Sequence, residues 1–78
     1  MPPPEHYFTE VEARSKLRMR VRVKRGGGGY TVGQTGIVHE TGYDPETAGY
    51  YVVVYWDNGD PATQYTRTAY EANVEELA

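Results

Sequence analysis

Hydrophobic and polar positions alternate without a fault from residue 16 to residue 24. The apolar positions are Leu17, Met19, Val21 and Val23, and the positions beside them form a basic stripe of Lys16, Arg18, Arg20, Arg22 and Lys24. A period of two is typical of a strand with one buried face. We therefore predict a first strand over residues 17–24, with every cation of the basic stripe facing solvent.

Glycines divide the next part of the chain. Four of them, at 26–29, predict a loop that continues to Gln34. Residues 35–41 are expected to form a second strand, with Gly36 at a bulge or bend. A further loop is expected over residues 42–49, where Tyr-Asp-Pro-Glu has the composition of a turn.

Residues 50–56 form an unbroken run of aromatic and β-branched side chains. Such a run predicts a third strand that is covered on both faces. It leads directly to Asn58-Gly59, the residue pair that most readily adopts the positive φ angles of a tight hairpin turn. We expect Asn58 and Gly59 at the central positions of that turn.

The remaining segments complete an all-β domain. Residues 61–67 are expected to return antiparallel as a fourth strand, residues 68–72 to form one helical turn, and residues 73–77 to form a closing strand. Five short strands with a turn before the last are typical of a single SH3-like barrel. Ahead of it, residues 5–15 have weak helical spacing and predict a loosely attached arm or a single helical turn.

Length and composition limit the chain to one small domain. It has 78 residues, so we divide it into an N-terminal tail or arm over residues 1–15 and an SH3-like barrel over residues 16–78. It has no cysteine, which excludes disulfides and thiolate metal sites and fits a reducing compartment. No stretch has the length of a membrane span. We expect a soluble, cytoplasmic protein without membrane contact.

The formal net charge of −3 conceals a strong asymmetry. Seven of the eight basic residues lie between Arg14 and Arg25, a run without any acid, whereas residues from Gly26 onward carry Arg67 against eight acids. A row of like charges on one strand needs an opposing charge. Three sources are open: acids on neighbouring strands (Glu40, Glu75 and Glu76), a nucleic-acid backbone, or an acidic protein partner. Alternatively, the stripe only keeps a strand edge soluble.

One part of the chain resembles a known family. It reads Gly36-Ile37-Val38-His39-Glu40, then a loop, then Val52-x-Val54-x-Trp56-Asp57-Asn58-Gly59, with Tyr65 following. This pattern resembles the Mib/Herc2 domain and, more distantly, the KOW motif of ribosomal and transcription-elongation proteins. Both are SH3-like barrels, and the resemblance covers residues 17–77. It implies a barrel that binds a partner and does not catalyse a reaction.

The resemblance also implies the orientation of the third strand. Val52, Val54 and Trp56 would point inward, so that Tyr51 and Tyr55 point outward. Tyrosine offers large rigid area and one hydroxyl, which favours it at binding surfaces. With Tyr30 and Tyr43 in the two long loops, we predict a tyrosine rim that binds a partner, while three arginines of the stripe engage its acidic groups. The predicted site is therefore Arg18, Arg20, Arg22, Tyr30, Tyr43, Tyr51 and Tyr55.

Catalytic chemistry has little support in the sequence. His6 and His39 have no second histidine or cysteine at metal-ligand spacing, and Ser15, the only serine, lies in a basic run. No Gly-Lys-Ser/Thr follows the glycine run, so it is not a phosphate loop. We therefore predict no enzyme, cofactor or metal. The predicted function is recognition of a protein segment; the alternatives are nucleic-acid binding through the basic stripe and homodimerisation through the tyrosines.

Overall fold

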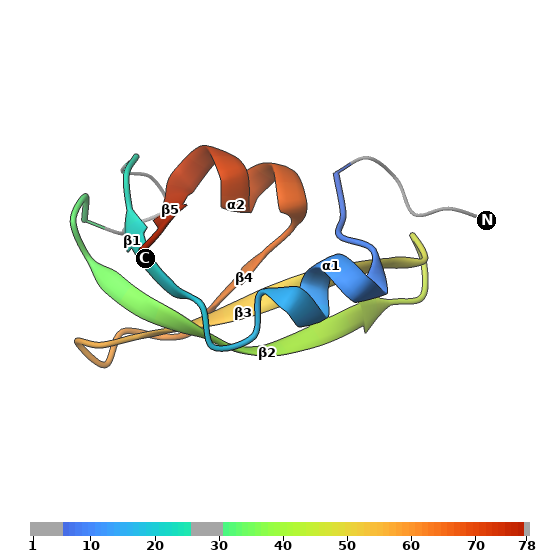
Figure 1. The fold of residues 1–78 in the computed structure, drawn as a ribbon, viewed down its shortest axis with the longest axis horizontal. Coiled ribbons are helices and arrows are strands. Elements are labelled where there is room, and N and C mark those ends of the chain that lie inside the picture. Colours follow the sequence, from blue (N-terminus) through green and yellow to red (C-terminus); the bar gives the residue numbers. More distant parts are fainter. Residues whose placement is uncertain (1–5, 26–30, 78) are drawn as a thin grey trace.

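The computed structural model describes residues 6–25 and 31–77, so the predicted glycine loop and Tyr30 lie outside the described residues. In chain order (Figure 1), the elements are α1 (Glu10–Ser15), β1 (Arg20–Val23), β2 (Thr35–Asp44), β3 (Gly49–Trp56), β4 (Thr63–Tyr65), α2 (Arg67–Asn73) and β5 (Val74–Glu76). The five predicted strands and the helical turn before the last strand are confirmed.

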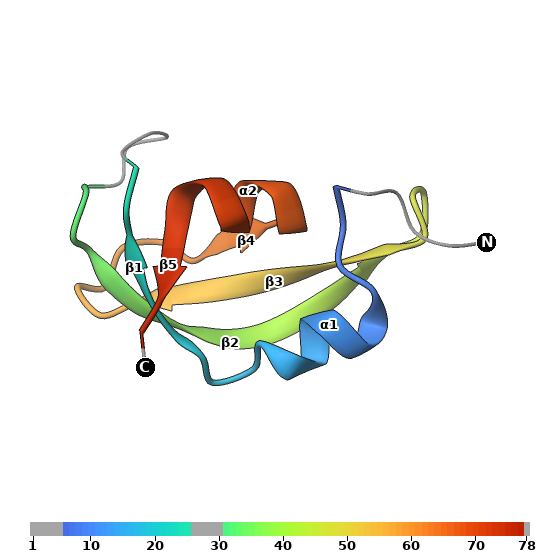
Figure 2. The same ribbon diagram turned by 45° about the horizontal axis from the view of Figure 1, so that its top comes forward.

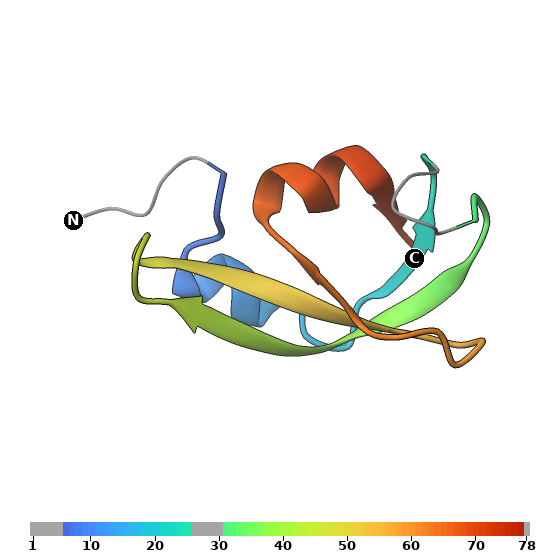
Figure 3. The same ribbon diagram turned by 180° about the vertical axis from the view of Figure 1, so that it is seen from behind.

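All five strands belong to one antiparallel sheet with the order β4-β3-β2-β1-β5. The long β2–β3 hairpin forms the floor, and the sheet curls so that α2 lies above it (Figure 1, Figure 2). β4 pairs antiparallel with β3 at the edge of the sheet, and the chain then rises from β4 into α2 (Figure 3). Because α2 connects the two edge strands and no described pairing joins them, the architecture is an open half-barrel. Among the described residues, this sheet does not show the closure that the predicted SH3-like barrel requires.

The core lies between the curled sheet and α2. Val52, Val54 and Trp56 are buried, which confirms the inward orientation predicted for alternate residues of β3. The Trp56 ring meets Tyr65 edge-on at 6.4 Å, and its indole N–H donates to the Thr63 hydroxyl at 3.0 Å. The other buried core residues are Phe8, Ala13, Val21, Val23, Val38, Tyr70 and Val74. The third strand was also predicted to be covered on both faces. On its outer face this is confirmed at Val53, which is buried, but not at Tyr55, which is 42% exposed.

The segment before β1 is part of this core. Thr9 caps α1 through a capping box: its hydroxyl accepts from the Glu12 amide at 3.2 Å, and the Glu12 carboxylate accepts from the Thr9 amide at 2.9 Å. Phe8 and Tyr50 exchange two backbone hydrogen bonds of 3.0 Å, and Ala13 is fully buried. The predicted helical turn is confirmed, whereas the expectation of loose attachment is wrong because these residues contribute core packing.

The first strand is shorter than the alternation predicted. Lys16 and Leu17 amides still donate to carbonyls of α1, so the helix turn occupies residues expected in the strand. Arg18 then adopts a left-handed conformation with φ 70°, which reverses the chain into β1. Leu17 is consequently 41% exposed instead of facing the core.

The second strand is longer than predicted and carries its bulge at a different place. Val38 pairs with Val54 and Glu40 with Val53, so His39 is the extra residue. Gly36 instead permits a close approach: a β-carbon there would lie 2.7 Å from the Tyr55 carbonyl oxygen and 2.8 Å from the Trp56 ring.

The turn after β3 is tight but shifted by one residue from the prediction. The Gly59 amide donates to the Trp56 carbonyl at 3.2 Å, which places Asp57 and Asn58 at the central positions. Gly59 follows with φ 85°, as expected for one residue of the pair. The fourth strand is shorter than predicted because Thr66 already caps α2, its hydroxyl accepting from the Ala69 amide.

Replacing Gly59 separates backbone strain from packing, because a β-carbon at this position would meet open space. We expect Gly59→Val to lower the free energy of unfolding by more than about 1 kcal/mol, since a β-branched residue is strained at positive φ. Gly59→Asn should retain most of the stability, because asparagine tolerates the left-handed region. Urea denaturation followed by Trp56 fluorescence measures both; equal stability of the valine variant and the wild type would contradict this account of the turn.

Candidate binding surface

The basic stripe is largely neutralised within the domain. Arg22 lies opposite Glu75 in the β1–β5 pairing, with its Nε 2.8 Å from the carboxylate. Arg20 donates two hydrogen bonds to Asp57, of 3.0 and 2.7 Å. The Lys16 ammonium lies 2.7 Å from Glu76. Three of the five stripe residues therefore have an internal acidic partner, the first of the alternatives that the sequence left open for the stripe.

The predicted acidic partners are only partly right. Glu75 and Glu76 neutralise stripe residues, as one of the alternatives required, but Glu40 instead accepts a hydrogen bond of 3.1 Å from the Tyr55 hydroxyl. The third acid that neutralises a stripe residue is Asp57, the partner of Arg20. It is held beside β2 because its amide donates to the Thr35 carbonyl and its carboxylate accepts from the Thr35 hydroxyl at 2.6 Å.

These pairs shift the pKa values of their members. Hydrogen bonds from Arg20 and then Thr35 lower the pKa of Asp57, and the hydrogen bond from Lys16 lowers that of Glu76 against the opposing effect of burial. Burial, followed by the hydrogen bond to Glu76, raises the pKa of the Tyr70 hydroxyl. The Lys16 ammonium also lies 5.5 Å from the centre of the Tyr70 ring. This cluster joins the end of α1 to α2 and β5, so its role is structural.

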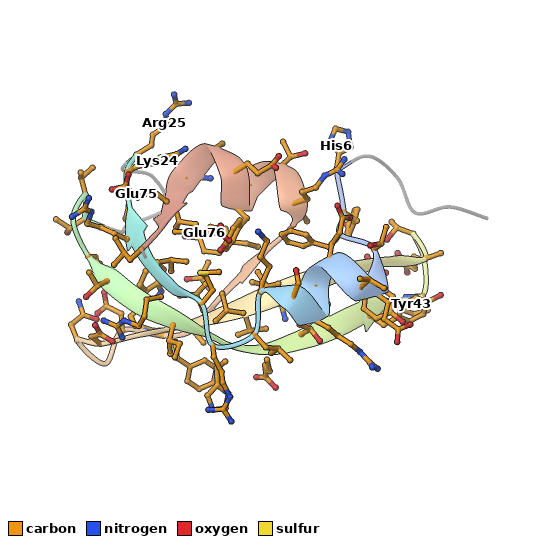
Figure 4. All side chains as sticks on the ribbon, viewed as in Figure 1. His6, Lys24, Arg25, Tyr43, Glu75 and Glu76 are labelled. Atoms are coloured by element: carbon orange, nitrogen blue, oxygen red, sulfur yellow. The ribbon has the colours of Figure 1, made fainter. Side chains whose placement is uncertain are left out.

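Arg18 and Lys24 are the two stripe residues without an ion pair in residues 6–25 and 31–77. Lys24 extends beside Arg25 from the end of β1, at the end of the molecule away from Tyr43 (Figure 4). Arg18 lies before β1, in the turn that follows α1. The two unpaired cations therefore flank β1 at its opposite ends.

The predicted tyrosine rim is divided between two faces. Tyr51 and Tyr55 lie on the outer face of β3, opposite the core, where they pair with Gly42 and Ile37 of β2. Tyr43 pairs with Tyr50, and their rings lie 5.1 Å apart on the other face, near the end of the hairpin (Figure 4). The extra residue in the β2 bulge causes this reversal, because unbroken alternation from Ile37 would have placed Tyr43 on the outer face.

Tyr55 and the bulged His39 form the centre of the outer face. Their rings stack at 4.3 Å with an interplanar angle of 30°. The hydrogen bond that Tyr55 donates to Glu40 raises the pKa of the Tyr55 hydroxyl. Tyr51 is half-buried because its ring lies over Gly42. Tyr55, rather than Tyr51, therefore presents an exposed aromatic surface.

Beside this stack, a pocket of about 200 Å³ is lined by Leu17, Arg18, Ile37, Val38 and His39. Its walls are held by two backbone hydrogen bonds across the gap: the Arg18 amide donates to the Val38 carbonyl at 2.8 Å, and the Val38 amide to the Met19 carbonyl at 2.9 Å. We call the residues around this pocket the outer patch; it consists of the exposed Leu17, Arg18, His39 and Tyr55 and the half-buried Ile37.

Sequence reasoning found two members of the outer patch, Arg18 and Tyr55, and missed the other three. Leu17 was expected in the core, and His39 was considered only as a metal ligand. A cue was present at Leu17, because the capping box that starts α1 predicts a helix continuing toward this residue. The bulge that exposes His39 has no such local signal.

Comparison with protein-family models, with curated proteins and with solved structures finds no match. Within the described part of the chain, no group of three histidine, cysteine, aspartate or glutamate side chains is arranged to hold a metal ion. Neither helix is long and apolar enough to cross a membrane. Functional inference therefore depends on the surface itself.

Exchanging the charges of Arg22 and Glu75 tests whether the stripe stabilises the sheet. Arg22→Glu places two carboxylates opposite each other and should lower the free energy of unfolding by up to about 1 kcal/mol. Adding Glu75→Arg should restore most of that loss. Lys24→Glu is the matched control, because Lys24 has no ion pair among the described residues, and it should change stability less. Urea denaturation measures the free energy of unfolding of each variant. A double variant that is no more stable than Arg22→Glu would contradict the pairing of Arg22 with Glu75.

The pKa shifts predict a pH window of maximal stability. Asp57 and Glu76 have folded-state pKa values below their ordinary ones, so their contribution is present above the ordinary carboxylate values and lost as the pH falls through the lowered ones. Tyr70 has a raised pKa, so its contribution is present below the ordinary tyrosine value and lost as the pH rises above it. Unfolding free energy should therefore decline at both extremes.

Two variants test which groups cause the loss of stability at acidic pH and at alkaline pH. Glu76→Gln should flatten the acidic limb, and Tyr70→Phe the alkaline limb, in denaturation curves measured across pH. Glu71→Gln, an exposed glutamate outside the cluster, is the control and should leave the profile unchanged. If Glu76→Gln and Glu71→Gln have the same profile, the Lys16–Glu76–Tyr70 cluster does not govern acid stability.

Proposed function

We propose that this domain is a non-catalytic binding module for a protein segment, which docks on the outer patch. The observation that carries the proposal is the exposed Tyr55–His39 stack beside a pocket with both apolar and polar lining, on one face of the sheet. Leu17 and Tyr55, 41% and 42% exposed, contribute large apolar area at the same place. Exposed apolar area gathered at one place is a mark of interaction sites.

The size of the pocket favours a peptide over a small molecule. Pockets for drug-sized ligands have volumes of roughly 300–1,000 Å³, whereas this one measures about 200 Å³ and takes a single side chain. The neighbouring face of Tyr55 gives a flat platform on which adjacent residues of an extended segment can lie. The resemblance to Mib/Herc2 and KOW-type barrels also favours a binding role.

Nucleic-acid binding through the basic stripe has less support. It requires cations that are free to neutralise phosphates, and Lys16, Arg20 and Arg22 are occupied by Glu76, Asp57 and Glu75. Contact with a phosphate backbone would break these pairs and bring carboxylates close to it. The protein segment is therefore the proposed ligand, and of the three arginines predicted for the site (Arg18, Arg20 and Arg22) the proposal keeps Arg18.

Selection from a displayed library of short random peptides tests the proposal. Tyr55→Ala should weaken binding of selected peptides by about tenfold or more, as for an aromatic hot spot. Tyr43→Ala is the matched control: Tyr43 is 50% exposed but lies on the opposite face of the hairpin, so its loss should change affinity less than about twofold. Titration calorimetry with synthetic peptides measures both.

Two results would contradict the proposal. One is a selection that enriches no peptide, or peptides whose binding is equally sensitive to Tyr43→Ala and Tyr55→Ala. The other is binding of a labelled single-stranded oligonucleotide that falls steeply with salt and is lost in Arg20→Ala and Arg22→Ala, which would favour the nucleic-acid alternative. Sedimentation over a range of concentrations reveals whether a second copy of the chain occupies the patch instead.

A further inference from the structure

We infer that the segment bound by the outer patch carries an aspartate or glutamate beside an aliphatic side chain, and that Arg18 binds its carboxylate. This inference depends on the proposed function and specifies its ligand. It follows from the backbone at Arg18, from the bulge that faces it, and from the charges around the pocket.

Arg18 occupies a backbone conformation that suits glycine. Its φ of 70° lies in the left-handed region, which residues other than glycine, asparagine and aspartate rarely adopt. The other described residues at positive φ are Gly33, Gly59 and Ala48, so Arg18 is the one with a long side chain. An arginine at such a position is strained, and strain of this kind is concentrated at binding and catalytic sites. A binding role for the side chain would account for an arginine in this turn.

A second backbone irregularity lies directly across from the first. The Arg18 amide donates to the carbonyl of Val38, the residue at which the β2 bulge begins. Bulges redirect side chains and are frequent beside functional sites. Here the bulge directs His39 onto Tyr55, while the left-handed turn leaves Leu17 exposed. The two irregularities thus build the same pocket from opposite sides.

The charges around the pocket favour an anionic ligand. Arg18 is the only charged residue among its lining residues and has no ion pair in the described part of the chain. Glu40, the acid on the same face, is hydrogen-bonded to the Tyr55 hydroxyl. A guanidinium binds a carboxylate through two parallel hydrogen bonds. The apolar side chains of Leu17 and Ile37 suit a neighbouring aliphatic side chain.

The test uses the peptides selected on the whole domain, displayed so that their C-termini are not free. We expect them to share an aspartate or glutamate next to Leu, Ile, Val or Met. Replacing that acid by its amide should weaken binding to the wild type by about tenfold or more, the size of a charged hydrogen bond. Arg18→Gly should weaken binding of the acidic peptide equally. The two changes together should cause no additional loss, because they remove the same contact.

Arg18→Gly is suited to this test because glycine adopts the φ of residue 18 without strain, so the melting temperature should not fall. Ala48→Gly is the backbone control: Ala48 also has positive φ, at 59°, but lies in the β2–β3 turn. Lys24→Ala is the charge control, since it removes the other unpaired cation of the stripe. Both controls should bind the acidic peptide as the wild type does.

The outcomes separate this inference from the proposed function. Selected peptides that carry no shared acid, or that bind Arg18→Gly as well as the wild type, overturn the carboxylate while peptide recognition stands. A selection that enriches no peptide contradicts both the proposed function and this inference. If Arg18→Gly does not fold, the comparison of acidic and amide peptides on the wild type still decides, and equal affinity overturns the inference.

Discussion

The ring of Trp56 packs where Gly36 has no side chain, and the core is assembled around that contact. A β-carbon at Gly36 would meet the Trp56 ring at 2.8 Å, so the β2–β3 hairpin can curl inward only with glycine there. The same ring reaches Tyr65 of β4 and donates to Thr63, which fixes the strand that leads into α2. α2 then carries Tyr70 against Phe8, whose backbone pairs with Tyr50. The segment around Phe8 is therefore held through the aromatic core as well as through the sheet.

Ion pairs link the elements on the surface of the molecule, and aromatic contacts link them in the core. The acid-free run before residue 26 and the acid-rich remainder of the chain are brought together when β1 pairs with β5. Individually, exposed ion pairs contribute little. Together with the backbone pairing they favour one register, because a slip of one residue would place Arg22 away from Glu75 and bring the core residues Val21 and Val23 to the surface.

Local signals in the sequence predicted the fold well where they were strong. The apolar run of β3 and the closing α2–β5 segment were located, and the turn after β3 was predicted to within one residue, because each depends on neighbouring residues. The predictions were wrong where the bounds or the facing of one element depend on a neighbouring element. Alternation alone could not show that the end of α1 reaches Leu17, nor that one extra residue at His39 reverses the face of Tyr43. Of the residues predicted for the site, Arg18 and Tyr55 lie together on the outer patch, Arg20 and Arg22 are paired with Asp57 and Glu75, and Tyr43 lies on the other face; Tyr30 lies outside the described residues.

The position of β5 also sets the order in which this domain can form. β1 pairs with β2 across a short stretch of sequence, but its other edge pairs with residues 74–76, the last strand of the sheet. Pairings between distant residues form slowly, and during synthesis this one must wait until β5 has emerged. Until then β1 presents an open edge, which invites association with other chains. Arg20 and Arg22, which pair with Asp57 and Glu75 in the folded domain, place positive charge on that edge, and charge of this kind disfavours edge-to-edge association.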